Sequence, residues 1–236
     1  MIALTAALAA AVVFAQAPVP AIGPGSTVAA VALRADGAII VAGTTQGSQG
    51  GQSSQGGLDA FIAWLTPEGL LERVLQFGTS GDERVGSLIL DEQGNIYVTG
   101  DTNMQLSFAV GTGAQFVVKF TPEGQLLWAK NFGGNESYSP PVIALDGAGD
   151  VIVAGSQPSG RTKSYGRLGQ QPFYEAYLAV LTLDGELIDD HVFTVDETQA
   201  PTEALPLSDG SLVILGLQSL ELLAAMARSH TVSLPA

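Results

Sequence analysis

A short motif occurs four times along this sequence at nearly constant spacing. In each copy a strand-like segment runs into a tight turn ending in glycine, and an apolar segment then closes on a second glycine. The copies are VALRADGAIIVAG, LILDEQGNIYVTG, IALDGAGDVIVAG and PLSDGSLVILG, and their closing glycines, Gly43, Gly100, Gly155 and Gly216, lie 57, 55 and 61 residues apart. A fixed period of roughly 40–60 residues is typical of propellers and solenoids, in which each repeat is one supersecondary unit.

A second motif lies between the copies of the first and keeps the same phase. It reads DAFIAWLTPEGLLERVLQFG, AQFVVKFTPEGQLLWAKNFGG and EAYLAVLTLDGELIDDHVF. In two copies Pro67 and Pro122 preset φ at the second position of a turn, and Gly69 and Gly124 supply the positive φ that completes it. The second motif therefore predicts a β-hairpin, so that each repeat contributes four strands.

Apolar runs without alternation indicate how these strands are packed. Ile96–Val98 and Val151–Val153 are continuous apolar runs, as expected of strands covered on both faces. We therefore predict an all-β fold, a β-propeller of four-stranded blades with about four blades in this chain. A β-sandwich with chance internal similarity is the alternative.

The expected blades are approximately residues 28–77, 85–132, 141–194 and 203–236. The end of the last blade, SLELLAAMARSHTVSLPA, lacks the turn motif and is also compatible with a short helix. An outer strand for this blade is expected from Pro18–Ile22, with Thr231–Leu234 as the rival, because an open edge strand invites aggregation.

The motifs resemble those of a known family. DAFIAWLTPEGLL, ERVGSLILDEQGNIYVTGDT and AQFVVKFTPEGQLLWAKNFGG are similar to the bacterial seven-bladed β-propeller (SBBP-type) repeat family, whose units include an Asp-Ala-Phe strand, a Pro-x-Gly turn and a Gly-Asn-x-Tyr-Val-x-Gly strand. The resemblance implies a propeller fold and an exported bacterial origin, and it carries over no catalytic residues. Since about four units fit, we expect either a closed small ring or a partial ring completed by another subunit.

The N-terminus predicts export. Residues 2–15 are almost wholly apolar and precede an extended, proline-containing stretch, which is the pattern of a secretory signal peptide. Val13 and Ala15 occupy the two positions that signal peptidase reads, so we expect a signal peptide at 1–15 and a propeller domain at 16–236. The leader carries no Lys or Arg, and a misplaced start codon or a retained hydrophobic anchor is the alternative.

The charge balance argues against polyanionic partners. The chain has 9 Lys and Arg residues against 23 Asp and Glu residues, a formal net charge of −14 at pH 7, and such a surface repels nucleic acid and anionic membranes. We expect a secreted, periplasmic or cell-surface protein whose partner is an extracellular protein or glycan, or a second copy of itself. Nucleic-acid binding and membrane insertion after leader removal are not expected.

Three connections between the two motifs are the candidate recognition loops: residues 44–58, 101–113 and 156–173. Variable loops on a rigid scaffold commonly carry recognition. The third concentrates basic and aromatic side chains that can stack on a sugar or pair with a carboxylate: Arg161, Lys163, Tyr165 and Arg167. A solvated loop with charges for solubility is the alternative. The Gln-, Gly- and Ser-rich first loop is expected to be a mobile linker.

Catalytic and metal-binding patterns are sparse. The turns at Asp91–Asn95 and Asp146–Asp150 carry oxygen donors, but no calcium-loop motif is present and Asp and Asn are ordinary turn formers. The chain has two histidines, His191 and His230, and no cysteine. The adjacent carboxylates Asp189 and Asp190 would point to opposite faces of a strand. We therefore expect no metal site, no cofactor and no enzymatic activity.

Three functional hypotheses follow from these patterns. The first is an exported, non-enzymatic propeller scaffold that binds an extracellular glycan or protein through the loops of one face. The second is a structural subunit of a surface layer or filament assembled through exposed strand edges. The third is an enzyme with a site in the central channel.

Overall fold

The computed structural model describes residues 22–135, 137, 139–164, 170–193, 201–206, 212–216 and 223–225. Side chains are described for these residues except 163, 164, 170–173, 193 and those from 201 onward. The predicted signal peptide and Thr231–Leu234 therefore lie outside the described residues. Of the segment expected to dock on the last blade, only Ile22 is described, and it packs against the cluster of the first sheet that contains Ile39 and Val41.

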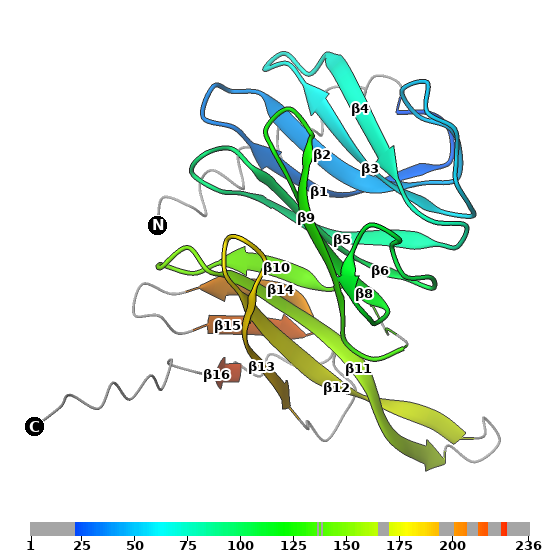
Figure 1. The fold of residues 1–236 in the computed structure, drawn as a ribbon, viewed down its shortest axis with the longest axis vertical. Coiled ribbons are helices and arrows are strands. Elements are labelled where there is room, and N and C mark those ends of the chain that lie inside the picture. The colour runs from blue at the N-terminus through cyan, green and yellow to red at the C-terminus, as the bar shows by residue number, and fades with distance from the viewer. Residues whose placement is uncertain are drawn as a thin grey trace, which may run out of the picture.

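All regular structure in the described residues is β (Figure 1), which confirms the predicted all-β class. The first sheet has the strand order β1-β2-β3-β4, all antiparallel. Its strands are β1 (Ser26–Leu33), β2 (Ile39–Thr45), β3 (Asp59–Leu65) and β4 (Leu71–Phe77). The second sheet has the order β5-β6-β8-β9-β7, and only β7 pairs in parallel, with β9. Its strands are β5 (Glu83–Leu90), β6 (Ile96–Thr102), β7 (Val110–Gly111), β8 (Gln115–Phe120) and β9 (Leu126–Phe132).

The third and fourth sheets follow the same antiparallel order. The third consists of β10 (Val142–Leu145), β11 (Val151–Ser164), β12 (Gln170–Leu181) and β13 (Leu187–Phe193). The fourth consists, within the described residues, of β14 (Pro201–Pro206), β15 (Leu212–Gly216) and β16 (Leu223–Ala225). Residues 223–225 are thus a strand, where the sequence was also compatible with a helix. No helix in the described part of the chain is long and apolar enough to cross a membrane.

Both predicted turn types adopt the expected backbone. Gly69 and Gly124 have φ of 84° and 79°, and each donates its N–H to the carbonyl three residues earlier, at Thr66 and Thr121. Asp91 and Asp146 act as turn formers, since one oxygen of each accepts backbone N–H groups within its own turn. These assignments were predicted from sequence and are confirmed.

The closing glycines of the first motif make room for aromatic rings. Gly43 is the cross-strand partner of Phe61, and Gly100 is the partner of Phe116. A Cβ at Gly43 would lie 2.7 Å from Cζ of Phe61, and a Cβ at Gly100 would lie 2.4 Å from Cζ of Phe116. In these two repeats, therefore, the glycine of one motif leaves room for the aromatic ring of the other.

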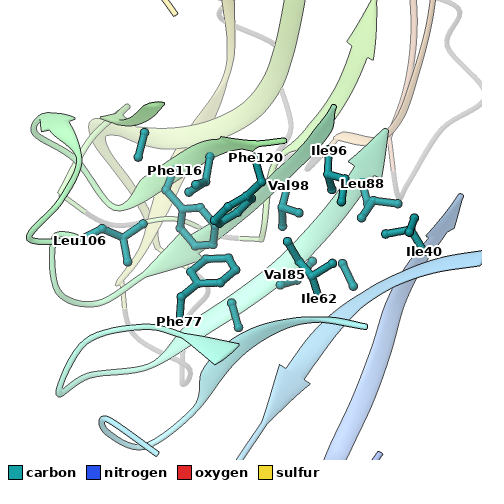
Figure 2. Close-up of a cluster of buried hydrophobic side chains, with 14 of the residues drawn as sticks. Ile40, Ile62, Phe77, Val85, Leu88, Ile96, Val98, Leu106, Phe116 and Phe120 are labelled. Carbon is teal, nitrogen blue, oxygen red and sulfur yellow. The ribbon is translucent and has the colours of Figure 1, made fainter. Parts of the chain in front are cut away.

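The sheets pack face to face in chain order. The first strands of consecutive sheets lie against each other, β1 against β5, β5 against β10 and β10 against β14, and Figure 1 shows the resulting stack. The main core lies between the first and second sheets (Figure 2), where Phe77 packs edge-on against Phe116 and beside Phe120. A further cluster around Tyr97 and Val153 joins the second and third sheets.

Candidate functional site

The third sheet extends a long β-ribbon beyond its neighbours. Residues 156–173 were expected to be a loop, but β11 continues to Ser164 and β12 begins at Gln170. Since β10 pairs only with Val151–Ala154 of β11, the segment Gln157–Ser164 pairs with β12 alone. We call Gln157–Ser164 together with Gln170–Glu175 the repeat-3 hairpin, and Figure 1 shows it projecting away from the stacked sheets.

The predicted ligand-contact residues belong to this hairpin in part. Arg161 is described, its side chain is 53% exposed, and Nη2 lies 3.8 Å from Oε1 of Glu175 on the opposite strand. Lys163 lies on β11 opposite Gln171, although its side chain is not described. Tyr165 and Arg167 lie outside the described residues. The hypothesis that the four act together therefore stays a prediction.

The loop-bearing face of the first two sheets is built around buried polar groups. The loop after β2 joins the link between β4 and β5, because Gly57 donates its N–H to the carbonyl of Gly81 and Leu58 donates to Oδ1 of Asp82, at 2.8 and 3.0 Å. Within residues 44–58, where a mobile linker is expected, Gln49 is 3% exposed. Its amide Nε2 donates to Ser26 and Thr45. Nothing in the composition of this segment distinguishes Gln49 from the glutamines beside it.

Two buried carboxylates, Asp59 and Glu83, meet beneath this loop. Glu83 accepts hydrogen bonds from the Thr79 N–H and hydroxyl and from the Thr102 hydroxyl, at 2.7, 2.6 and 2.7 Å. Oδ2 of Asp59 accepts from Gln76 Nε2 at 2.7 Å and from a backbone N–H, while Oδ1 has no hydrogen-bond partner among the described residues. Sequence reasoning missed both groups, because single acidic residues at strand ends look like solvated positions.

Gly78 lies between these carboxylates. A Cβ at Gly78 would be 2.4 Å from Oδ1 of Asp59 and 2.4 Å from Oε2 of Glu83, so the two oxygens lie within twice that distance of each other. Burial raises the pKa of Glu83, and the charge of Asp59 acts in the same direction. The pair therefore favours retention of a proton on Glu83.

A third carboxylate on this face, Asp101, is also affected by burial. Desolvation raises its pKa to about 6, against the attraction of Arg84, whose Nη1 lies 3.9 Å away. The charge of Asp82 acts in the same direction as burial. Within the described ranges, no three His, Cys, Asp or Glu side chains are arranged to hold a metal ion. These carboxylates can therefore bind protons and accept hydrogen bonds at the ends of the strands.

A pocket and an exposed His–Asp pair are two further features of the described structure. A cavity of about 360 Å³ lies between the turns at 34–36 and 91–94, but Arg34 and Asp36 on its wall pair with each other at 3.0 Å. His191 on β13 lies 2.9 Å from Asp189, with both side chains exposed. His230 lies outside the described residues.

One repeat of the chain matches a known family model. Residues 72–104, which run from β4 to just past β6, match the family model SBBP, described as a beta-propeller repeat. The chain carries an SBBP repeat. This confirms the family resemblance drawn from the motifs. No curated protein matches the sequence.

The solved structures that match the chain include the following two. One is MPT-4, a mannose phosphorylase from Leishmania mexicana in complex with phosphate ion, with 14% identity and a TM-score of 0.41; the match covers 81% of this chain and 62% of that one. Another is a glucose dehydrogenase, with 14% identity and a TM-score of 0.39, covering 84% of this chain and 82% of that one.

Proposed function

We propose that this SBBP-repeat chain is an exported, non-enzymatic propeller scaffold that binds an extracellular glycan or protein, and that the repeat-3 hairpin is its contact element. The stack of sheets supplies rigid support, with about four blades of four strands each as the architecture. Export rests on the apolar segment 2–15.

The observation that carries the proposal is the length of this hairpin. β11 has 14 residues and β12 has 12, whereas the corresponding strands β2, β3, β6 and β8 have 7, 7, 7 and 6. A two-stranded ribbon outside a sheet is marginally stable by itself, so its extra residues contribute little to the core. Such an element is suited to contacting something outside the fold.

The side chains of the hairpin narrow the class of partner that it could bind. Arg161, Lys163 and Arg167 are three of the chain's nine basic residues, and Tyr165 and Tyr174 lie among or beside them. Guanidinium groups pair with carboxylates, and aromatic rings stack on sugar rings. An acidic glycan or an acidic protein segment fits this combination best.

Two variants test the proposal. In the first, residues 158–174 are replaced by Asn-Gly, which closes the hairpin between Gln157 and Glu175, a native cross-strand pair, with a favoured two-residue turn. The second changes the predicted contact residues to serine: Arg161→Ser, Lys163→Ser, Tyr165→Ser and Arg167→Ser. Binding of the mature protein to cell-surface material and to arrayed acidic glycans should be lost in both, with the melting temperature nearly unchanged.

A control variant removes two positive charges elsewhere, through Arg34→Ser with Lys130→Ser, and should bind as the wild type does. Equal binding by the wild type and the two hairpin variants would refute the contact role. If the wild-type protein binds neither cell-surface material nor acidic glycans but forms large assemblies in light scattering, the structural-subunit hypothesis would be favoured instead.

A further inference from the structure

The buried carboxylates of Asp59 and Glu83 meet without a cation between them. Asp59 is the first residue of β3 and Glu83 the first of β5, and both residues are 0% exposed. In the described part of the chain, no ion pair with Lys, Arg or His involves either carboxylate. Burying two like charges without a counter-ion is costly, so such a pair either binds a cation or keeps a proton.

The hydrogen bonds of the pair leave few acceptor positions open. Oε1 of Glu83 accepts from the hydroxyls of Thr79 and Thr102, and Oε2 accepts from the N–H of Thr79. Oδ2 of Asp59 accepts from Nε2 of Gln76 and from a backbone N–H. Since each carboxylate oxygen offers about two lone pairs, the open positions are those of Oδ1 of Asp59 and one on Oε2 of Glu83.

The two oxygens with open positions meet beside Gly78. Oδ1 of Asp59 and Oε2 of Glu83 each lie 2.4 Å from the position that a Cβ on Gly78 would occupy. Oδ1 has no hydrogen-bond partner among the described residues. Calcium takes six to eight oxygen ligands, and within the described ranges no third His, Cys, Asp or Glu side chain joins the pair to hold a metal. A single proton needs one lone pair on each of two oxygens, which this pair supplies.

We propose that Asp59 and Glu83 share one proton, carried on Oε2 of Glu83 and donated to Oδ1 of Asp59, and that this bridge is a pH-sensitive latch between the first two sheets. Backbone hydrogen bonds lie around the bridge. The N–H of Glu83 donates to the carbonyl of Leu58, and that of Gly57 donates to the carbonyl of Gly81, at 2.7 and 2.8 Å. The shared proton thus fastens the loop before β3 to the link before β5.

The charges around the latch determine how it responds to pH. Asp82 in the link accepts a loop N–H, and Asp101 on β6 pairs with Arg84 on β5, with Oδ1 and Nη1 3.9 Å apart. Burial raises the pKa of Glu83 from its ordinary 4.5, and the charge of Asp59 acts in the same direction. The folded state therefore holds a proton that the unfolded state releases. The contribution of the latch is present in acid and is lost as pH rises through the raised pKa.

Asp59→Asn tests the latch, because it replaces the shared proton with an amide. The asparagine NH2 can donate to Oε2 of Glu83 while its oxygen still accepts from Gln76, so the bridge persists without a titrating proton. The readout is amide hydrogen exchange of Gly57, Leu58 and Glu83 in the mature protein, corrected for the intrinsic pH dependence of exchange. In the wild type their protection should fall at least about 10-fold from about pH 4 to pH 8, and in Asp59→Asn it should stay within about 3-fold.

Asp101→Asn is the matched control, because it removes another buried carboxylate of the same face and leaves the pair intact. Protection of the three amides should still fall with pH in this variant. If protection in the wild type does not change with pH, or if the fall persists in Asp59→Asn, the inference is wrong.

A measurement on the wild type alone covers the case in which a variant does not fold. The carboxyl ¹³C signals of Asp59 and Glu83 should move in a common step as the pH is raised, because two groups that share a proton titrate as a pair. Separate, independent steps would overturn the proposal. It would also be overturned if millimolar Ca²⁺ restored protection of the three amides at about pH 8 and EDTA removed it, because the pair would then be a cation site.

Discussion

Gly78 separates two buried carboxylates, and the absence of a side chain is what allows them to sit so close. Gly78→Ala would place a methyl group 2.4 Å from an oxygen of Asp59 and of Glu83, so one carboxylate must move away from its hydrogen bonds. We expect a loss of about 1–3 kcal/mol in the free energy of unfolding, measured by urea denaturation. The control is Gly147→Ala, since nothing lies within 4 Å of its Cβ position; it should change stability by no more than about 0.5 kcal/mol.

Asp101 gives a second prediction at this scale, concerning pH. Its pKa rises from 3.8 to about 6 on folding, so the folded state holds a proton that the unfolded state releases, and its contribution to stability is lost as pH rises through this window. Asp101→Asn removes this effect. The variant should match the wild type near pH 4 and exceed its stability by about 1–3 kcal/mol near pH 7.

Denaturation at a series of pH values checks this prediction, with Glu92→Gln in an exposed turn as the control. A difference between Asp101→Asn and the wild type that stays constant from about pH 4 to pH 7 would contradict the assigned titration.

At the scale of elements, Trp64 and Arg73 are cross-strand partners that both donate to carbonyls of the turn at Pro122 and Glu123. One repeat later Lys119 and Trp128 are the cross-strand partners, so the indole and the cation should be able to trade places. Trp64→Lys alone leaves two cations across from each other and should cost about 2–4 kcal/mol. Adding Arg73→Trp places an indole across from the new cation, as Trp128 lies across from Lys119, without the Asp91 ion pair and the Tyr97 ring that Lys119 also contacts. It should recover at least about 1 kcal/mol, measured as a double-mutant cycle. Trp64→Lys with Glu72→Trp is the control, because neighbouring residues of β4 point to opposite faces. Equal recovery of stability in the two double variants would mean that an indole stabilises the protein equally from either face of β4.

The elements themselves were largely predictable, and their contacts were not. The turns at Gly69 and Gly124 follow from local φ preferences and the buried strands from apolar runs, both of which are encoded within a few residues. Burial of Gln49 and the pairing of Asp59 with Glu83 depend on side chains brought together by tertiary structure. Residues 156–173 were predicted to be a loop because Gly160 and Pro172 interrupt the apolar strand pattern. In the structure, pairing between β11 and β12 nevertheless extends both strands into this segment.

For the whole molecule, stacking of sheets in chain order implies that stability is shared between neighbours. In such arrays each repeat is stabilised chiefly by the interfaces on its two sides. The second sheet packs against the first through the cluster around Phe77 and Phe116 and against the third through that around Tyr97 and Val153. Among the first strands of the first three sheets, β1 is the least buried, with Val28 and Leu33 41% and 57% exposed. Amides of the second sheet should therefore exchange most slowly, and those of β1 should exchange fastest among the first strands of the first three sheets.

Phe77→Ala tests this arrangement, because Phe77 belongs to the first sheet and its ring packs against Phe116 and Phe120 of the second. The loss of a buried ring should cost about 3–5 kcal/mol. Hydrogen exchange followed by mass spectrometry should then show lost protection in the first and second sheets, with a smaller change in β10 to β13. Leu127→Ala, at a half-exposed site on β9, should leave the pattern unchanged. Equal loss of protection in all three sheets would instead mean that the stack unfolds as a single cooperative unit. The interfaces between sheets would then not contribute separately to local stability.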